Sequence, residues 1–201
     1  YKVHTGTAVA LSAAPLSANV FTTLNRADFF YSVGKLHVAN GVEEIRAYDG
    51  SAIRPVTGAI VAKWMIYYKS CLWAAGNPTA GNGSRLYRSG NGSYVGNFTN
   101  STANPLATSV DVSQSDGQDM KGFFKHQDYL YPLKERSLWR VSVGTDALGA
   151  ITQELVDPAR GTDSHFSIDT VDNDNFMFNE MGVYATGYEP NILDQIRTNI
   201  V

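Results

Sequence analysis

The strongest constraint on the fold of this chain is a motif that recurs four times along its 201 residues. Each copy has an aromatic-rich run, a turn, a short strand-like segment, a second turn and another strand-like segment. The later segments are marked by Ile45, Leu86, Leu138 and Val183, and these landmarks are spaced roughly 40 to 50 residues apart, as in propeller blades. The repeat predicts four similar units that are stacked against one another.

Alternating side chains indicate that the units are built from strands. Trp139, Val141 and Val143 would share one face of a strand, and Phe176 and Phe178 would share a face of another. Charged residues make up only 17% of the chain, and Ser, Thr, Asn and Gly take their place. This composition favours short strands joined by tight turns over long helices with ion-paired faces.

Asn40-Gly41 lies between two strand-like segments, and this dipeptide is typical of a two-residue hairpin turn. The Ser-, Thr- and Asn-rich stretch 97–115 falls in the longest spacing between landmarks and is predicted to be an exposed loop.

The fold class predicted from these patterns is all-β, a β-propeller or a propeller fragment of about four antiparallel sheet repeats, with a β-sandwich as the alternative. The units are expected near 26–56, 61–100, 119–156 and 161–201, after an N-terminal strand or linker over 1–25. The chain starts at Tyr1 and not at Met, which indicates a processed chain or part of a longer one.

Composition also excludes several functions. The net charge of −3 is unsuited to nucleic-acid binding, which requires a basic face. No apolar run reaches the length of a membrane-spanning helix. Cys71 is the one cysteine, so it forms no internal disulfide and supplies no zinc site by itself.

An acidic loop is the one candidate metal site, with Asp169, Asp172 and Asp174 as potential Ca²⁺ ligands. The loop lacks the Gly and the distant Glu of an EF-hand, so a plain turn between strands is favoured. Ser164 and His165 follow Asp163, but neighbouring positions in sequence do not make a catalytic triad. His165 is predicted to lie in a strand. No catalytic residue and no cofactor are predicted.

Several stretches of the units resemble the propeller region of tail structural proteins of tailed bacteriophages. They are Leu36 to Gly41, Ile45 to Gly50, Arg85-Leu86-Tyr87-Arg88-Ser89 and Phe123 to Trp139. In the last stretch, Leu130-Tyr131 is followed by Lys134 and by Ser137-Leu138-Trp139, in the order typical of such a unit. The resemblance covers roughly residues 28 to 190. It implies a non-enzymatic virion component whose partners are identical subunits and other tail proteins.

Two other functions stay open from the residues alone. A carbohydrate- or receptor-binding propeller would carry an exposed aromatic residue in each unit and would bind a host surface glycan. A glycan hydrolase would need paired carboxylates. The four units show no Asp, Glu or Trp repeated at one register, which favours a structural subunit of a phage tail or of its nozzle or adaptor ring.

Overall fold

The computed structural model describes residues 21, 25–146, 148–171, 174–188 and 196–200. It confirms the all-β prediction: the described residues form sixteen strands in four antiparallel sheets, with short 3₁₀ turns and no α-helix. The expected N-terminal strand or linker over 1–25 lies outside the described residues, apart from Phe21 and Asn25.

Each sheet is a four-stranded meander of strands that are consecutive in the chain. The first sheet holds β1 (Asp28–Ser32), β2 (Lys35–Ala39), β3 (Arg46–Tyr48) and β4 (Ile53–Pro55). The second holds β5 (Trp64–Tyr68), β6 (Cys71–Ala75), β7 (Arg85–Asn91) and β8 (Thr108–Asp111). The third holds β9 (Met120–His126), β10 (Tyr129–Lys134), β11 (Leu138–Val143) and β12 (Ile151–Asp157). The last holds β13 (Asp169–Val171), β14 (Asp174–Asn179), β15 (Gly182–Tyr188) and β16 (Ile196–Ile200).

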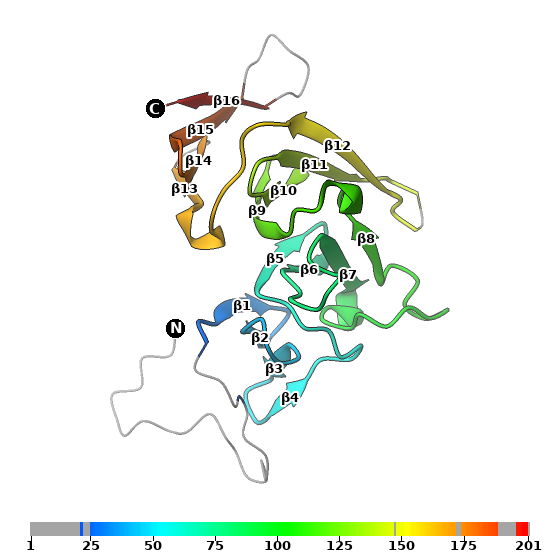
Figure 1. The fold of residues 1–201 in the computed structure, drawn as a ribbon. Helices are drawn as coiled ribbons and strands as arrows, with labels where there is room; N and C mark the ends of the chain where they lie inside the picture. The colour runs from blue at the N-terminus through cyan, green and yellow to red at the C-terminus, as the bar shows by residue number, and fades with distance from the viewer. Residues whose placement is uncertain (1–20, 22–24, 147, 172–173, 189–195, 201) are drawn as a thin grey trace.

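The four sheets follow one another along an arc that does not close into a ring (Figure 1). β1, β5 and β9 lie toward the middle of the molecule, and β4 and β12 lie outside (Figure 1). The opening of the arc separates the first sheet from the last (Figure 1). This open arrangement, in which each sheet packs on its neighbours, is consistent with a propeller fragment and also with the β-sandwich alternative.

Three apolar cores fill the junctions between successive sheets. Leu72 and Ala74 pack with Ile45 between the first and second sheets. Trp73 and Phe123 are central to the largest core, between the second and third sheets. Tyr131, Leu133, Leu138, Met177 and Tyr184 form the core between the third and last sheets. Because each sheet buries apolar side chains on its neighbours, no sheet of this size needs to be stable alone.

The connections between sheets are anchored in a repeated way. The amide of Gly41 donates to the carbonyl of Ala62, in the connection that leads to the second sheet. Met120 N, where the second connection ends in β9, donates to Gly83 O, and Thr162 N, in the connection to the last sheet, donates to Lys134 O. These hydrogen bonds tie each connection to the sheet that precedes it.

The first hairpin differs from the sequence prediction. The two-residue turn lies at Val33-Gly34, where both residues have positive φ, of 48° and 73°, as a hairpin of matching twist requires. Asn40 instead opens a longer turn, in which its side-chain oxygen accepts hydrogen bonds from the amides of Val42 and Glu43. The side chain of Asn40 therefore closes this longer turn with its own hydrogen bonds, in place of a tight two-residue turn.

Two further predictions were wrong. The stretch 97–115 was predicted to be a loop, but it contains β8, whose Val110 pairs with Leu86. β8 is an edge strand with exposed Thr108 and Ser109, so its apolar signal is weak. His165, predicted to lie in a strand, lies in a 3₁₀ turn, His165–Ser167, because the side chain of Ser164 accepts a hydrogen bond from Phe166 N.

Candidate functional site: the two end faces

The last sheet has an apolar face on which no other sheet of the described residues packs. Phe178 of β14 pairs with Val183 of β15 on this face, and they are 51% and 42% exposed. Val171 of β13 and Met181 of the turn after β14 are 54% and 62% exposed. We call Val171, Phe176, Phe178, Met181 and Val183 the last-sheet face.

The opposite face of the last sheet is the buried one, and it is unusually polar. Asn175, Met177 and Asn179 point toward the third sheet and are almost fully buried. Phe176 and Phe178 do share a face, as predicted, but that face points away from the core. This arrangement places apolar residues on an exposed face, where a strand normally carries polar ones.

Hydrogen bonds explain how the polar face can be buried. The Nδ2 of Asn175 lies 3.1 Å from the Nδ1 of His126 in the third sheet. The hydroxyl of Thr170 donates to Asn175 Oδ1 at 2.8 Å, and the hydroxyl of Thr186 donates to the Asn175 carbonyl at 3.2 Å. With its polar atoms satisfied, Asn175 can lie at a sheet junction without a large desolvation cost.

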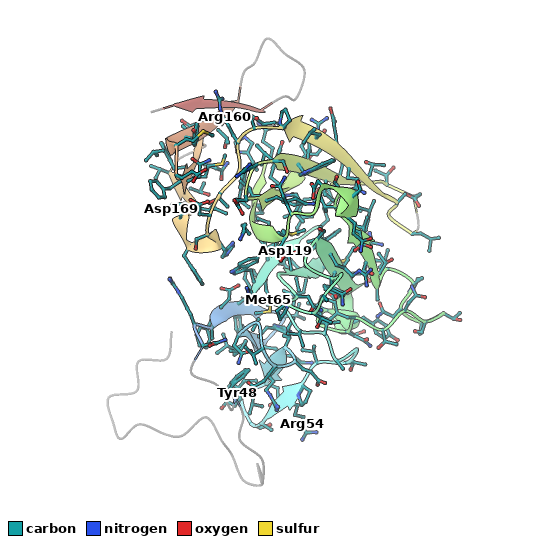
Figure 2. All side chains as sticks on the ribbon, viewed as in Figure 1. Tyr48, Arg54, Met65, Asp119, Arg160 and Asp169 are labelled. Carbon is teal, nitrogen blue, oxygen red and sulfur yellow. The ribbon has the colours of Figure 1, made fainter. Side chains whose placement is uncertain are left out.

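The first sheet has a second exposed face, at the other side of the opening. Phe29 and Tyr31 of β1 are 58% and 70% exposed, and they pair with buried Val38 and half-buried Leu36 of β2 on one face. The same face continues to Arg46 and Tyr48 of β3. We call Phe29, Tyr31, Leu36, Val38, Arg46 and Tyr48 the first-sheet face. Tyr48 and Asp169, labelled in Figure 2, lie on the first and last sheets, on either side of the opening.

The two end faces carry opposite charges. Asp169 pairs with Phe176, and Asp174 pairs with Val171, so both exposed carboxylates lie on the last-sheet face. Arg46 supplies a guanidinium to the first-sheet face, where its Nε is buried without a hydrogen-bond partner. Its guanidinium carbon lies 5.7 Å from the ring of Phe21.

The predicted Ca²⁺ loop is placed only in part. Asp169 and Asp174 start β13 and β14, and Asp172 lies outside the described residues. The Oδ1 of Asp169 accepts a hydrogen bond from the amide of Thr170. Among the residues that the structure describes, no three His, Cys, Asp or Glu side chains gather as a metal site would require.

His165 lies at the centre of the arc and has a packing role. Its ring centroid is 5.5 Å from Trp64 and 5.6 Å from Phe123, and its Nδ1 is within 3.5 Å of the Phe123 amide. Burial, followed by the nearby positive charge of Arg26, lowers the pKa of His165 to about 4. The guanidinium of Arg26 in turn lies 3.2 Å from the ring centroid of Phe166, which links the segment before β1 to the last unit.

Two cavities lie at sheet junctions. One of about 270 Å³ lies between the third and last sheets and is lined by Glu135, Asp163 and Glu180 among others. The other, of about 320 Å³, lies between the first sheet and the loop after β7. Its lining includes His37, which is 1% exposed and whose Nε2 has no hydrogen-bond partner. Desolvation lowers the pKa of His37, which keeps the ring neutral at pH 7.

Cys71 is buried in the core between the second and third sheets. Burial raises the pKa of its thiol. The thiol therefore stays protonated at neutral pH, which is unsuitable for a nucleophile.

No protein-family model matches the chain, and no curated protein is significantly similar to it. Within the described part of the chain, no helix is long and apolar enough to cross a membrane.

Proposed function

We propose that this protein is a structural subunit that assembles through the apolar faces of its end sheets, as a component of a bacteriophage tail or of its nozzle or adaptor ring. The observation that carries the proposal is the pair of exposed apolar faces at the two ends of the arc. Phe29 and Tyr31 lie at one end, and Phe178, Met181 and Val183 lie at the other. Contiguous exposed apolar side chains of this kind mark surfaces that are covered in the functional state.

Three further features support an assembly subunit. Burial accounts for the perturbed pKa values of His165, which packs on Trp64 and Phe123, and of Cys71, which lies in the largest core. The low charge of the chain reduces repulsion between identical copies. The resemblance of the repeated units to phage tail propellers supplies the biological setting, with other tail proteins as partners and no catalytic turnover expected.

The test is the mass and shape of the purified chain, by light scattering over a range of concentrations and by negative-stain electron microscopy. We expect an assembly of defined mass, with a ring or tube in projection. The Phe178→Lys variant should lose the assembly, because a charge would have to be buried at the contact. Leu148→Lys is the matched control: Leu148 is 58% exposed but lies on the loop between β11 and β12.

A monomer at every concentration would contradict the proposal, as would equal assembly of the wild-type protein and the Phe178→Lys variant. Circular dichroism of both variants confirms that a loss of assembly does not come from unfolding.

A further inference from the structure

We infer that the last-sheet face of one copy packs on the first-sheet face of a second copy, so that the series of stacked sheets continues from chain to chain. This inference rests on the proposed function and specifies the mode of contact. The partner is a second copy of this chain, and the contact is head-to-tail.

The repeat supplies the first argument. We call the side of a sheet that faces the next sheet in the chain its later-facing side, and the opposite side its earlier-facing side. At every internal junction, the later-facing side of one sheet packs on the earlier-facing side of the next sheet. The later-facing side of β6 presents Cys71, Trp73 and Ala75, which are buried against the third sheet. The later-facing side of β10 presents Tyr131 and Leu133, which are buried against the last sheet.

Phe176 and Phe178 occupy the same place in β14, the second strand of the last sheet, but among the described residues no sheet packs on them. In the described part of the chain, no sheet packs on the earlier-facing side of the first sheet either, where Phe29 and Tyr31 are exposed. The two free faces are therefore the two halves of one further junction of the same kind. Within one copy they lie on either side of the opening (Figure 1), so a second copy can supply each missing half.

Charge supplies the second argument. Asp169 and Asp174 flank the apolar residues of the last-sheet face. Arg46, which pairs with Val38, supplies a guanidinium to the first-sheet face. Carboxylates on one face and a guanidinium on the other are complementary in a head-to-tail contact. In a contact between two identical faces, each of these charged groups would instead lie opposite a group of the same charge.

A head-to-tail contact uses two different surfaces, so it repeats until a ring closes or a filament forms. This property allows a test with two variants that are each blocked on one face. Phe178→Lys blocks the last-sheet face, and Tyr31→Lys blocks the first-sheet face. Both positions are at least half exposed, so both variants should fold, and the two altered faces repel each other in a mixture.

The experiment is sedimentation velocity of each variant alone, of their equimolar mixture and of the wild-type chain, with Leu148→Lys as the matched control. We expect each variant alone to be monomeric. The mixture should give a one-to-one pair and nothing larger, because only one unblocked face of each kind remains. The wild-type chain and the control should give the full assembly.

The outcomes separate the two proposals. If the wild-type chain is monomeric at all concentrations, the proposed function fails as well. If the wild-type chain assembles but Phe178→Lys or Tyr31→Lys alone still forms dimers, the contact joins identical faces and the head-to-tail inference is overturned. If the wild-type chain assembles and the mixture stays monomeric, the inference is overturned while the assembly function stands.

Discussion

The side chain of Lys134 is fully buried, yet it carries a charge. Its Nζ donates hydrogen bonds to both carboxylate oxygens of Asp116, at 2.7 and 2.8 Å, and to the carbonyl of Ser113, at 2.8 Å. This contact fixes the 3₁₀ turn after β8 against the end of β10. A buried ion pair tolerates loss of both charges better than loss of one, because the remaining charge is uncompensated.

We therefore predict that Asp116→Ala lowers the free energy of unfolding by about 3 kcal/mol, since the Lys134 ammonium stays buried. The Lys134→Met/Asp116→Ala double variant should lose less than the single Asp116→Ala variant. Urea denaturation followed by fluorescence measures both. Glu135→Gln is the control, because its contacts with Lys121 and Arg136 are exposed, at 3.9 Å, and contribute little. A double variant that is less stable than Asp116→Ala would refute the role assigned to this pair.

The low pKa of His165, about 4, makes stability depend on pH. The unfolded chain has a histidine pKa near 6.5, so protons bind the unfolded state more tightly. The stability that neutral His165 contributes to the folded state is fully present above about pH 6.5 and is lost as the pH falls toward 4. Between pH 7 and 5 the loss should be no more than about 2 kcal/mol.

Comparison of the wild-type chain with His165→Phe isolates this contribution, by thermal or urea unfolding at pH 7, 6 and 5. The variant keeps a ring between Trp64 and Phe123 and cannot be protonated, so its stability should fall less steeply. Burial also lowers the pKa values of His37 and His126, so the variant keeps part of the slope. Parallel slopes for the two proteins would show that His165 is not buried in its neutral form.

At the scale of the elements, Arg88 of β7 connects two sheets. Its guanidinium donates to the carbonyl of Leu106 at 2.7 Å, and to those of Gly149 and Leu148 at 2.6 and 3.0 Å. The first carbonyl precedes β8, and the other two lie in the turn between β11 and β12. One planar side chain thus satisfies three carbonyls from two different sheets, which a lysine cannot do.

Arg88→Lys should therefore lower the free energy of unfolding by about 2 kcal/mol, because buried carbonyls lose their donors. Hydrogen exchange should become faster in the turn that contains Gly149. Arg85→Lys, which alters a surface pair with Asp111 at 2.8 Å, is the matched control and should change stability by less than about 1 kcal/mol. Equal losses in the two variants would contradict the assignment of Arg88 as the connecting residue.

At the scale of the whole molecule, the three junctions differ in strength. The junction between the second and third sheets has the largest apolar core, with Trp73 and Phe123. The junction with the last sheet has a smaller core, and buried Asn175 and Thr186 supplement it. In an array where each unit contacts only its neighbours, local stability follows the strength of these contacts.

Hydrogen exchange measured by mass spectrometry should therefore show the slowest amides in β6 and β10 and faster exchange in β14 and β15. Assembly should slow exchange in β14 and β15 if the last-sheet face becomes covered. Uniform exchange over all four sheets would mean that the molecule unfolds as one unit and would contradict the ranking of junctions.

The sequence by itself determined the number and kind of units. Spacing and alternation are local properties, so Trp139, Val141 and Val143 could be assigned to one face, and that face is buried or half-buried. The same alternation could not say which face of β14 is inside. The apolar side chains of Phe176 and Phe178 are typical of a core, but the buried face of β14 carries Asn175 and Asn179.

Only the tertiary structure decided which face of β14 is buried. Asn175 can be buried only where His126, Thr170 and Thr186 form hydrogen bonds with it. Those partners come from other strands, and one of them comes from another sheet. The edge strand β8 escaped prediction for a related reason, since pairing with Leu86 and its neighbours defines it more than its own residues do. Local pattern therefore determined the four-sheet repeat, and long-range contacts determined which faces stay exposed.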